Sequence, residues 1–265
     1  MNPEQLDSLE DPRLAPYRGL TGKRDLRDAG LLIAESRFLV ERLLASSFTV
    51  ESILVDDPTK IPDLPPERAA TPIYCLPRPL LQELVGFNFH RGVMACGRRA
   101  DLTDLRQVAW PQRDRLTLAV AAQVVDPENL GSLVRASSAF GADALLIDDR
   151  CGDPFSRRAL RVSTGHAFKI PIVETSDLIE QLQVAKSLGF ELVATVLDET
   201  ATPLKKETVR PGRTALLFGN EGFGLEAEVV ALADRRVTIP MERGSDSLNV
   251  SMAAGVFLYH YGYML

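Results

Sequence analysis

Six apolar runs, separated from one another by segments of helical period, fill the second half of the chain. The runs are nearly continuous in apolar residues, as expected for strands that are covered on both faces. Strands that alternate with helices predict an α/β domain with a mostly parallel six-stranded sheet, whose ligand binds outside the carboxyl ends of the strands. The strands are predicted at 116–125, 144–147, 170–173, 191–196, 214–218 and 237–239, and the helices at 129–140, 155–165, 177–188, 225–233 and 247–261.

A smaller set of alternating elements precedes this domain. Strands are predicted at 31–34, 52–56, 73–76 and 92–96, and helices at 36–45 and 79–85. The chain is therefore expected to divide into a lead-in without clear period at 1–28, a small α/β domain at 29–100, a polar linker at 101–114 and the larger α/β domain at 115–265.

The composition is that of a globular protein, with 45% apolar and 25% charged residues. No stretch approaches the roughly 20 apolar residues that a membrane span needs. The first residues are acidic and lack the apolar core of a signal peptide, so we expect a cytoplasmic protein. The formal charge of −6 argues against coating nucleic acid by bulk attraction, and still allows a local basic face.

The cysteines do not form a metal-binding pattern. Cys75, Cys96 and Cys151 are far apart, without CxxC spacing, and the chain has only three histidines. We predict structural thiols and no metal site.

The first candidate loop follows the first strand of the larger domain. Its chain turns at Pro127 into a helix that is predicted to open at Asn129, with Arg135 six residues further on. At about 100° per residue the two side chains are about 120° apart around the helix, so both can border one pocket without touching. Taken alone, Asn129 is equally well explained as a helix cap, and Arg135 is better explained as a solvated helix charge.

The second candidate loop lies between a strand and a helix at 216–225. Gly219, Gly222 and Gly224 let the backbone pass close to a ligand and present N–H groups to it. The spacing is neither GxGxxG nor that of a phosphate loop. Glu221, between these glycines, is either a solvated turn charge or a carboxylate that orients a hydroxyl or a cationic ligand.

The third candidate loop joins the last strand to the last helix. Ser247 is predicted to cap this helix, and Ser251 lies four residues later on the same face. Ala253, Ala254 and Gly255 predict that another backbone packs close to the helix. Local pattern alone favours capping and packing for Ser247, Asn249 and Ser251.

Taken together, the three loops form a pattern that is specific to one protein family. The three loops resemble the three motifs of the SpoU (TrmH-like) branch of the SPOUT RNA methyltransferases. The first motif is carried by Asp126-Pro127, Asn129, Gly131 and Arg135, and the second by the run 219–225. The third is carried by Ile239-Pro240-Met241 with Ser247, Asn249 and Ser251. The resemblance covers about 116–262 and includes the run 163–171. More loosely, the first half is similar to an L30e-like RNA-binding domain.

The resemblance implies a deep trefoil knot, a homodimer, and S-adenosylmethionine as cofactor for methyl transfer to a ribose 2′-hydroxyl of ribosomal or transfer RNA. No metal is required. The residues that it assigns to cofactor binding are Thr195, Val196, Leu197, Gly219, Asn220, Glu221, Gly224, Ile239, Met241, Ser247, Leu248 and Asn249.

Five residues match the family's catalytic positions: Arg135, Asn129, Glu221, Ser247 and Asn249. Arginine does not readily lose its proton, so electrostatic orientation of the substrate is the safer role for Arg135, although a role as base stays open. Phe223 and His166 depart from residues common in the family and are expected to alter the substrate rim. RNA contacts are expected from Arg91, Arg98, Arg99, Arg157, Arg158 and Arg161.

Two other functions compete with methyl transfer as explanations of the motifs. A non-catalytic RNA-binding or assembly factor with the same fold is disfavoured because every polar residue of the motifs is present. A nucleotide-dependent α/β enzyme is disfavoured because the chain lacks a phosphate-loop lysine.

Overall fold

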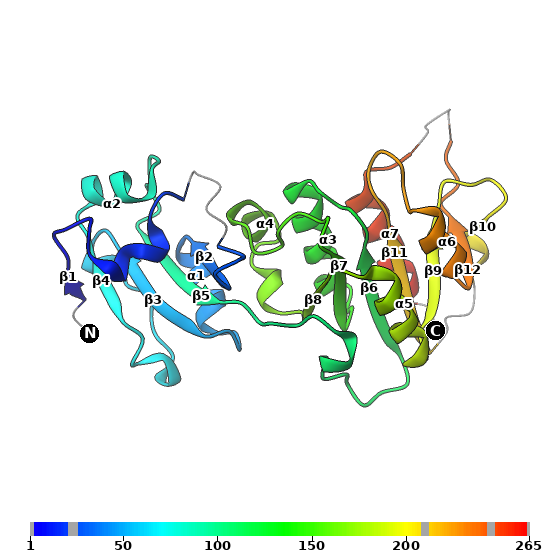
Figure 1. Ribbon diagram of the computed structural model, residues 1–265, viewed down its shortest axis with the longest axis horizontal. Coiled ribbons are helices and arrows are strands. Elements are labelled where there is room, and N and C mark those ends of the chain that lie inside the picture. The colour runs from blue at the N-terminus through cyan, green and yellow to red at the C-terminus, as the bar shows by residue number, and fades with distance from the viewer. Residues whose placement is uncertain (1–2, 21–25, 208–211, 243–246, 264–265) are drawn as a thin grey trace. The chain divides into compact units, whose positions relative to one another are not determined.

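The computed structural model describes residues 3–20, 26–207, 212–242 and 247–263. The chain folds into two compact units, of which the first comprises 1–101 and 155–168 and the second comprises 102–154 and 169–265. Figure 1 shows the elements of both units. None of the helices among the described residues is long and apolar enough to cross a membrane.

The second unit is built on a parallel sheet of seven strands in the order β10-β12-β9-β11-β6-β7-β8. Their bounds are β6 Leu116–Ala121, β7 Ala144–Asp148, β8 Ile172–Thr175, β9 Glu191–Thr195, β10 Thr202–Pro203, β11 Arg213–Phe218 and β12 Arg235–Thr238. All six predicted strands are present with shifted ends. The seventh, β10, was missed because two residues are too short for a detectable pattern.

Helices cover both faces of this sheet: α3 Pro127–Ala139, α5 Leu178–Ser187, α6 Ala227–Leu232 and α7 Val250–Tyr263, with short turns η4 Leu105–Gln107 and η6 Leu204–Lys206. α3 packs on α7, whereas α5 packs on α6 and η4. Apolar side chains of β6, β11 and α5 form one core. The close approach expected along α7 occurs at Gly262, where an added Cβ would lie 3.2 Å from the Phe140 carbonyl oxygen, whereas a Cβ on Gly255 would meet nothing within 4 Å.

Two helix starts differ from their predictions. Asp126 caps α3, because its carboxylate accepts the N–H groups of Glu128 and Asn129, so Asn129 lies inside the first turn. Asn249, and not Ser247, caps α7 by accepting the N–H of Ser251 at 2.9 Å. Serine and asparagine are both good caps, so the sequence does not choose between two that lie two residues apart.

The first unit contains a mixed sheet in the order β1-β4-β3-β5-β2. Its strands are β1 Glu4–Gln5, β2 Leu31–Glu35, β3 Val50–Val55, β4 Ile73–Cys75 and β5 Val93–Arg98, and β5 runs antiparallel to β2 and β3. The helical elements are α1 Arg37–Leu44, α2 Arg78–Val85, α4 Arg157–Val162, η1 Pro12–Tyr17, η2 Pro58–Lys60, η3 Pro66–Arg68 and η5 His166–Phe168.

The lead-in is part of this fold. β1 pairs with β4, and the buried Tyr17 hydroxyl donates to the Ser52 carbonyl oxygen at 2.9 Å. The part of the lead-in at 21–25 lies outside the described residues.

Candidate active site

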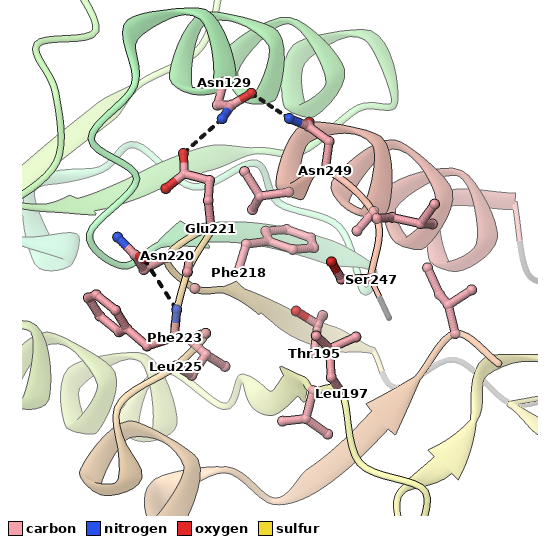
Figure 2. Close-up of a pocket in the computed structure, with 18 of the residues that line it drawn as sticks. Asn129, Thr195, Leu197, Phe218, Asn220, Glu221, Phe223, Leu225, Ser247 and Asn249 are labelled. Carbon is pink, nitrogen blue, oxygen red and sulfur yellow. Dashed lines mark hydrogen bonds between the residues drawn. The ribbon is translucent and has the colours of Figure 1, made fainter. Parts of the chain in front are cut away.

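A cavity of about 510 Å³ opens at the carboxyl ends of β9, β11 and β12. Figure 2 shows the side chains around it. All twelve residues that the family resemblance assigns to the cofactor line this cavity. The remaining lining residues are Asn129, Phe218, Gly222, Phe223, Leu225, Val250, Ala253 and Phe257. The stretch 243–246 of the third loop lies outside the described residues.

The loop after β11 is folded tightly on itself. Asn220 and Gly224 exchange two backbone hydrogen bonds of 3.0 Å. Gly219 lies so close to the returning chain that an added Cβ would come within 2.3 Å of the Gly224 carbonyl carbon. Gly224 adopts a φ of 72°, which favours glycine. The glycines are therefore needed to close this loop, and its backbone forms one wall of the cavity.

A buried carboxylate supports the same loop from behind. Asp148, at the end of β7, accepts the backbone N–H of Gln123 at 3.1 Å, and Gln123 has a φ of 56°. The Gln123 carbonyl oxygen then accepts a 2.9 Å hydrogen bond from Asn220 Nδ2. Sequence reasoning missed Asp148 and Gln123, and the only available signal was an acidic residue at the end of an apolar strand. These bonds join the loops after β6, β7 and β11.

Three polar side chains from the three motifs form a chain at the cavity. Asn249 Nδ2 donates to Asn129 Oδ1 at 2.7 Å, and Asn129 Nδ2 donates to Glu221 Oε1 at 2.9 Å (Figure 2). An ionised carboxylate can only accept, so Glu221 fixes the orientation of the Asn129 amide, which in turn requires the amino group of Asn249. The Asn249 oxygen is then left to cap α7.

Four of the five predicted catalytic residues line the cavity, including Ser247, and Arg135 does not. Arg135 is exposed on α3, beyond the first turn that carries Asn129. No described residue forms an ion pair or hydrogen bond with its guanidinium. Its charge is therefore available to a ligand.

The rest of the wall is largely apolar. Phe218, Ile239, Leu248 and Phe257 line it. The Thr195 hydroxyl donates to the Leu217 carbonyl oxygen at 2.7 Å, so this hydroxyl can only accept a hydrogen bond from a ligand. Apolar walls with backbone polar groups at the loop edges suit a ligand that has a flat ring and polar substituents.

The six arginines predicted to bind RNA all belong to the first unit. Arg157 forms a 2.6 Å ion pair with the buried Glu35, and its guanidinium lies over the Phe87 ring at 4.1 Å. Arg99 donates to the Leu31 carbonyl oxygen at 2.7 Å. These two guanidinium groups stabilise the fold of the unit.

The other four arginines differ in exposure. Arg91 and Arg98 are exposed and pair with Glu35 and Glu51 at 3.4 and 2.8 Å. Arg158 is exposed, whereas Arg161 has a buried Nε without a hydrogen-bond partner among the described residues. Arg91, Arg98 and Arg158 are therefore the more accessible members of the predicted set.

Known proteins similar to this chain agree with the motif assignment. Residues 117–259 match the model of the SpoU rRNA Methylase family. The chain belongs to this family. A tRNA/rRNA methyltransferase of Mycobacterium bovis, described as uncharacterized, is 38% identical over 258 residues, with 94% of this chain and 88% of the relative covered.

A 23S rRNA (guanosine(2553)-2′-O)-methyltransferase of Bacillus subtilis is 29% identical, with 97% and 98% covered. Solved structures share the fold of nearly the whole chain. A crystal structure of an RNA 2′-O ribose methyltransferase superposes with a TM-score of 0.73 at 28% identity, with 97% of each chain covered. An AdoMet-bound rRNA methyltransferase from Sinorhizobium meliloti gives a TM-score of 0.82 at 23% identity, also with 97% of each chain covered, and supports the fold alone.

Proposed function

We propose that this SpoU protein transfers a methyl group from S-adenosylmethionine to a ribose 2′-hydroxyl of ribosomal or transfer RNA. The observation that carries the proposal is the hydrogen-bonded chain Asn249–Asn129–Glu221, in which one polar residue from each motif meets at the cavity. Relatives named as 23S rRNA guanosine 2′-O-methyltransferases make 23S rRNA the first substrate to test.

The cavity fits the proposed cofactor in size and chemistry. Ile239, Leu248 and Phe218 offer apolar surface to an adenine ring, and the backbone of 219–224 offers polar edges to a ribose. Glu221 adds a negative charge to the wall, which suits a cationic sulfonium. When bound, S-adenosylmethionine supplies an activated methyl group.

The residues of the chain then have separate tasks. Asn129 and Asn249 hold the Glu221 carboxylate in one position, and this fixed network orients the ribose without reorganising during the reaction. We assign Arg135 to the substrate phosphate. Its permanent positive charge also stabilises the negative charge that develops on the 2′-oxygen as the hydroxyl proton passes to solvent water.

Several properties implied by the family resemblance belong to the same proposal. A homodimer is supported by an apolar stripe on α7, where Met252 is 61% exposed, Tyr259 59% and Tyr263 66%. The spacing of these residues places them on one side of the helix, and uncovered apolar stripes favour a protein partner. We also propose a trefoil knot formed by the cavity loops, and a cytoplasmic location, where ribosomal and transfer RNA are found.

Mapping of 2′-O-methyl groups in total RNA, with and without the gene, tests the proposal. Loss of one methylated ribose is expected, and purified protein with S-adenosylmethionine should restore it. An unchanged map together with no cofactor heat in calorimetry would instead indicate a non-catalytic RNA-binding or assembly factor.

A further inference from the structure

Phe223 is an exposed aromatic side chain at the mouth of the cavity. It is 67% exposed, although it is large and apolar, and it belongs to the loop that carries Glu221. No aromatic ring of the described residues packs against it. Single exposed apolar residues are common on protein surfaces, so exposure alone assigns no role.

The second observation is that the backbone under this ring is rigidly held. Asn220 Oδ1 accepts the N–H of Gly222 at 2.7 Å and that of Phe223 at 3.4 Å. Asn220 is itself held by Gln123, which is bound to the buried Asp148. The ring therefore projects from a fixed turn, and a flexible loop would more readily fold such a ring onto the protein.

Phe223 lines the mouth of the cavity, but its ring extends away from the centre of the cavity. Figure 2 shows Phe223 directed away from Phe218, Thr195 and Ser247, to the outer side of the loop. The ring is therefore accessible to a partner that approaches the mouth of the cavity from solvent, as an RNA substrate would.

We propose that Phe223 is a stacking platform for a nucleobase next to the methylated ribose, and so determines which RNA conformation is accepted. The inference rests on the proposed function. Proteins recognise splayed bases in RNA loops by stacking them on aromatic side chains. Glu221, only two residues from Phe223, belongs to the network assigned to the ribose, so a base of the same or the next nucleotide is within reach of the ring.

Substitution of Phe223 in the full-length protein tests this role. Phe223→Ala is expected to raise the KM for in vitro transcribed 23S rRNA, and its Kd in filter binding, by roughly 5- to 150-fold, the range of one base–aromatic stack of about 1–3 kcal/mol. Phe223→Trp should retain wild-type values, whereas Phe223→Leu, which is apolar but cannot stack, should behave like alanine. The Kd for S-adenosylmethionine and the Tm should remain within about twofold and a degree or two of wild type in all three variants.

The outcomes are distinct. RNA affinity unchanged in Phe223→Ala, or retained in Phe223→Leu, overturns the stacking role. A parallel loss of cofactor affinity, or dissociation of a dimer, overturns it as well, because the ring would then serve another partner. Since filter binding does not require turnover, a wild-type protein that binds RNA without methylating it contradicts the proposed function and leaves the stacking measurement valid.

Discussion

Asn249 Nδ2 donates a 2.7 Å hydrogen bond to Asn129 Oδ1 and joins two residues that are 120 positions apart. The bond connects the cap of α7 to the first turn of α3. Because Asn129 also binds Glu221, one amide links two helices and the glycine loop at the cavity. We expect substitution of Asn129 to lower the rate of methyl transfer more than the free energy of unfolding.

Asn129→Ala removes both bonds and leaves Glu221 without its amide donor. We expect kcat to fall roughly 10- to 100-fold, the value of a hydrogen bond to a charged group. Asn129→Asp is the sharper comparison, because it keeps an acceptor for Asn249 but places a second carboxylate against Glu221, and it should be at least as inactive. Single-turnover methyl transfer measures the effect, and wild-type rates in either variant would contradict the role of the network.

Arg135→Ala should abolish most methyl transfer without unfolding the protein. The side chain is exposed and has no partner among the described residues, so the free energy of unfolding should change by less than about 0.5 kcal/mol. Arg135→Lys keeps the charge but not the planar fork and should be partly active. Activity and thermal unfolding, measured on the same samples, separate the two effects. Full activity of the alanine variant would exclude Arg135 from the reaction.

Gly219→Ala should displace the loop after β11. The new Cβ would lie 2.3 Å from backbone, which cannot give way as a side chain can. A cost of about 1–3 kcal/mol for overpacking corresponds to a loss of cofactor affinity of roughly 5- to 150-fold in calorimetry. Gly222→Ala is the matched control, since its Cβ would meet only the Asn220 side chain at an ordinary 3.4 Å. Equal affinity for both variants would show that loop closure does not control binding.

Arg157 and Arg98 are both predicted to contact RNA, but their replacement should change the free energy of unfolding by different amounts. Arg157→Ala leaves the buried Glu35 with Arg91, at 3.4 Å, as its one ion-pair partner among the described residues, and we expect a loss of about 3 kcal/mol in unfolding free energy. Arg98→Ala breaks an exposed pair with Glu51 and should cost less than about 1 kcal/mol. Urea unfolding measures both. If Arg98→Ala weakens RNA binding at unchanged stability, its predicted role is supported, and unchanged binding would remove it from the RNA surface.

The three cysteines should resist alkylation in the native protein. All are buried, and burial raises the pKa of each thiol, to about 12 for Cys96. At pH 8 the thiols stay protonated and lack the reactive thiolate, whereas unfolding returns their pKa values toward about 8.5. Mass spectrometry after iodoacetamide treatment should therefore find three modifications in urea and none without it. Rapid labelling of a native cysteine would point to local opening around it.

The longer strands and the helices between them could be predicted from the sequence. The six longer strands of the parallel sheet follow from apolar runs such as 214–218, because burial on both faces leaves a continuous signal. Motif resemblance named twelve of the residues that line the cavity. The two-residue β10 and the antiparallel direction of β5 leave no local signal, since strand direction depends on pairing between distant segments.

Interactions between distant loops were equally invisible in the sequence. The support of Asn220 by Gln123 and Asp148 joins residues up to 97 positions apart. Ser247 was predicted to cap α7, but the neighbouring Asn249 does so, and that choice depends on where Asn129 presents its oxygen. Tertiary geometry therefore decided between residues of equal local propensity.

The first unit takes α4 and η5 from the middle of the chain, where Phe155 and Phe168 pack against Phe48 at ring distances of 5.7 and 5.6 Å. Removal of 1–101 would therefore strip these aromatic residues of their partner, and a truncated protein is expected to aggregate. The same connectivity constrains evolution and engineering. A relative's first unit can be grafted onto this chain only by exchanging 1–101 and 155–168 together.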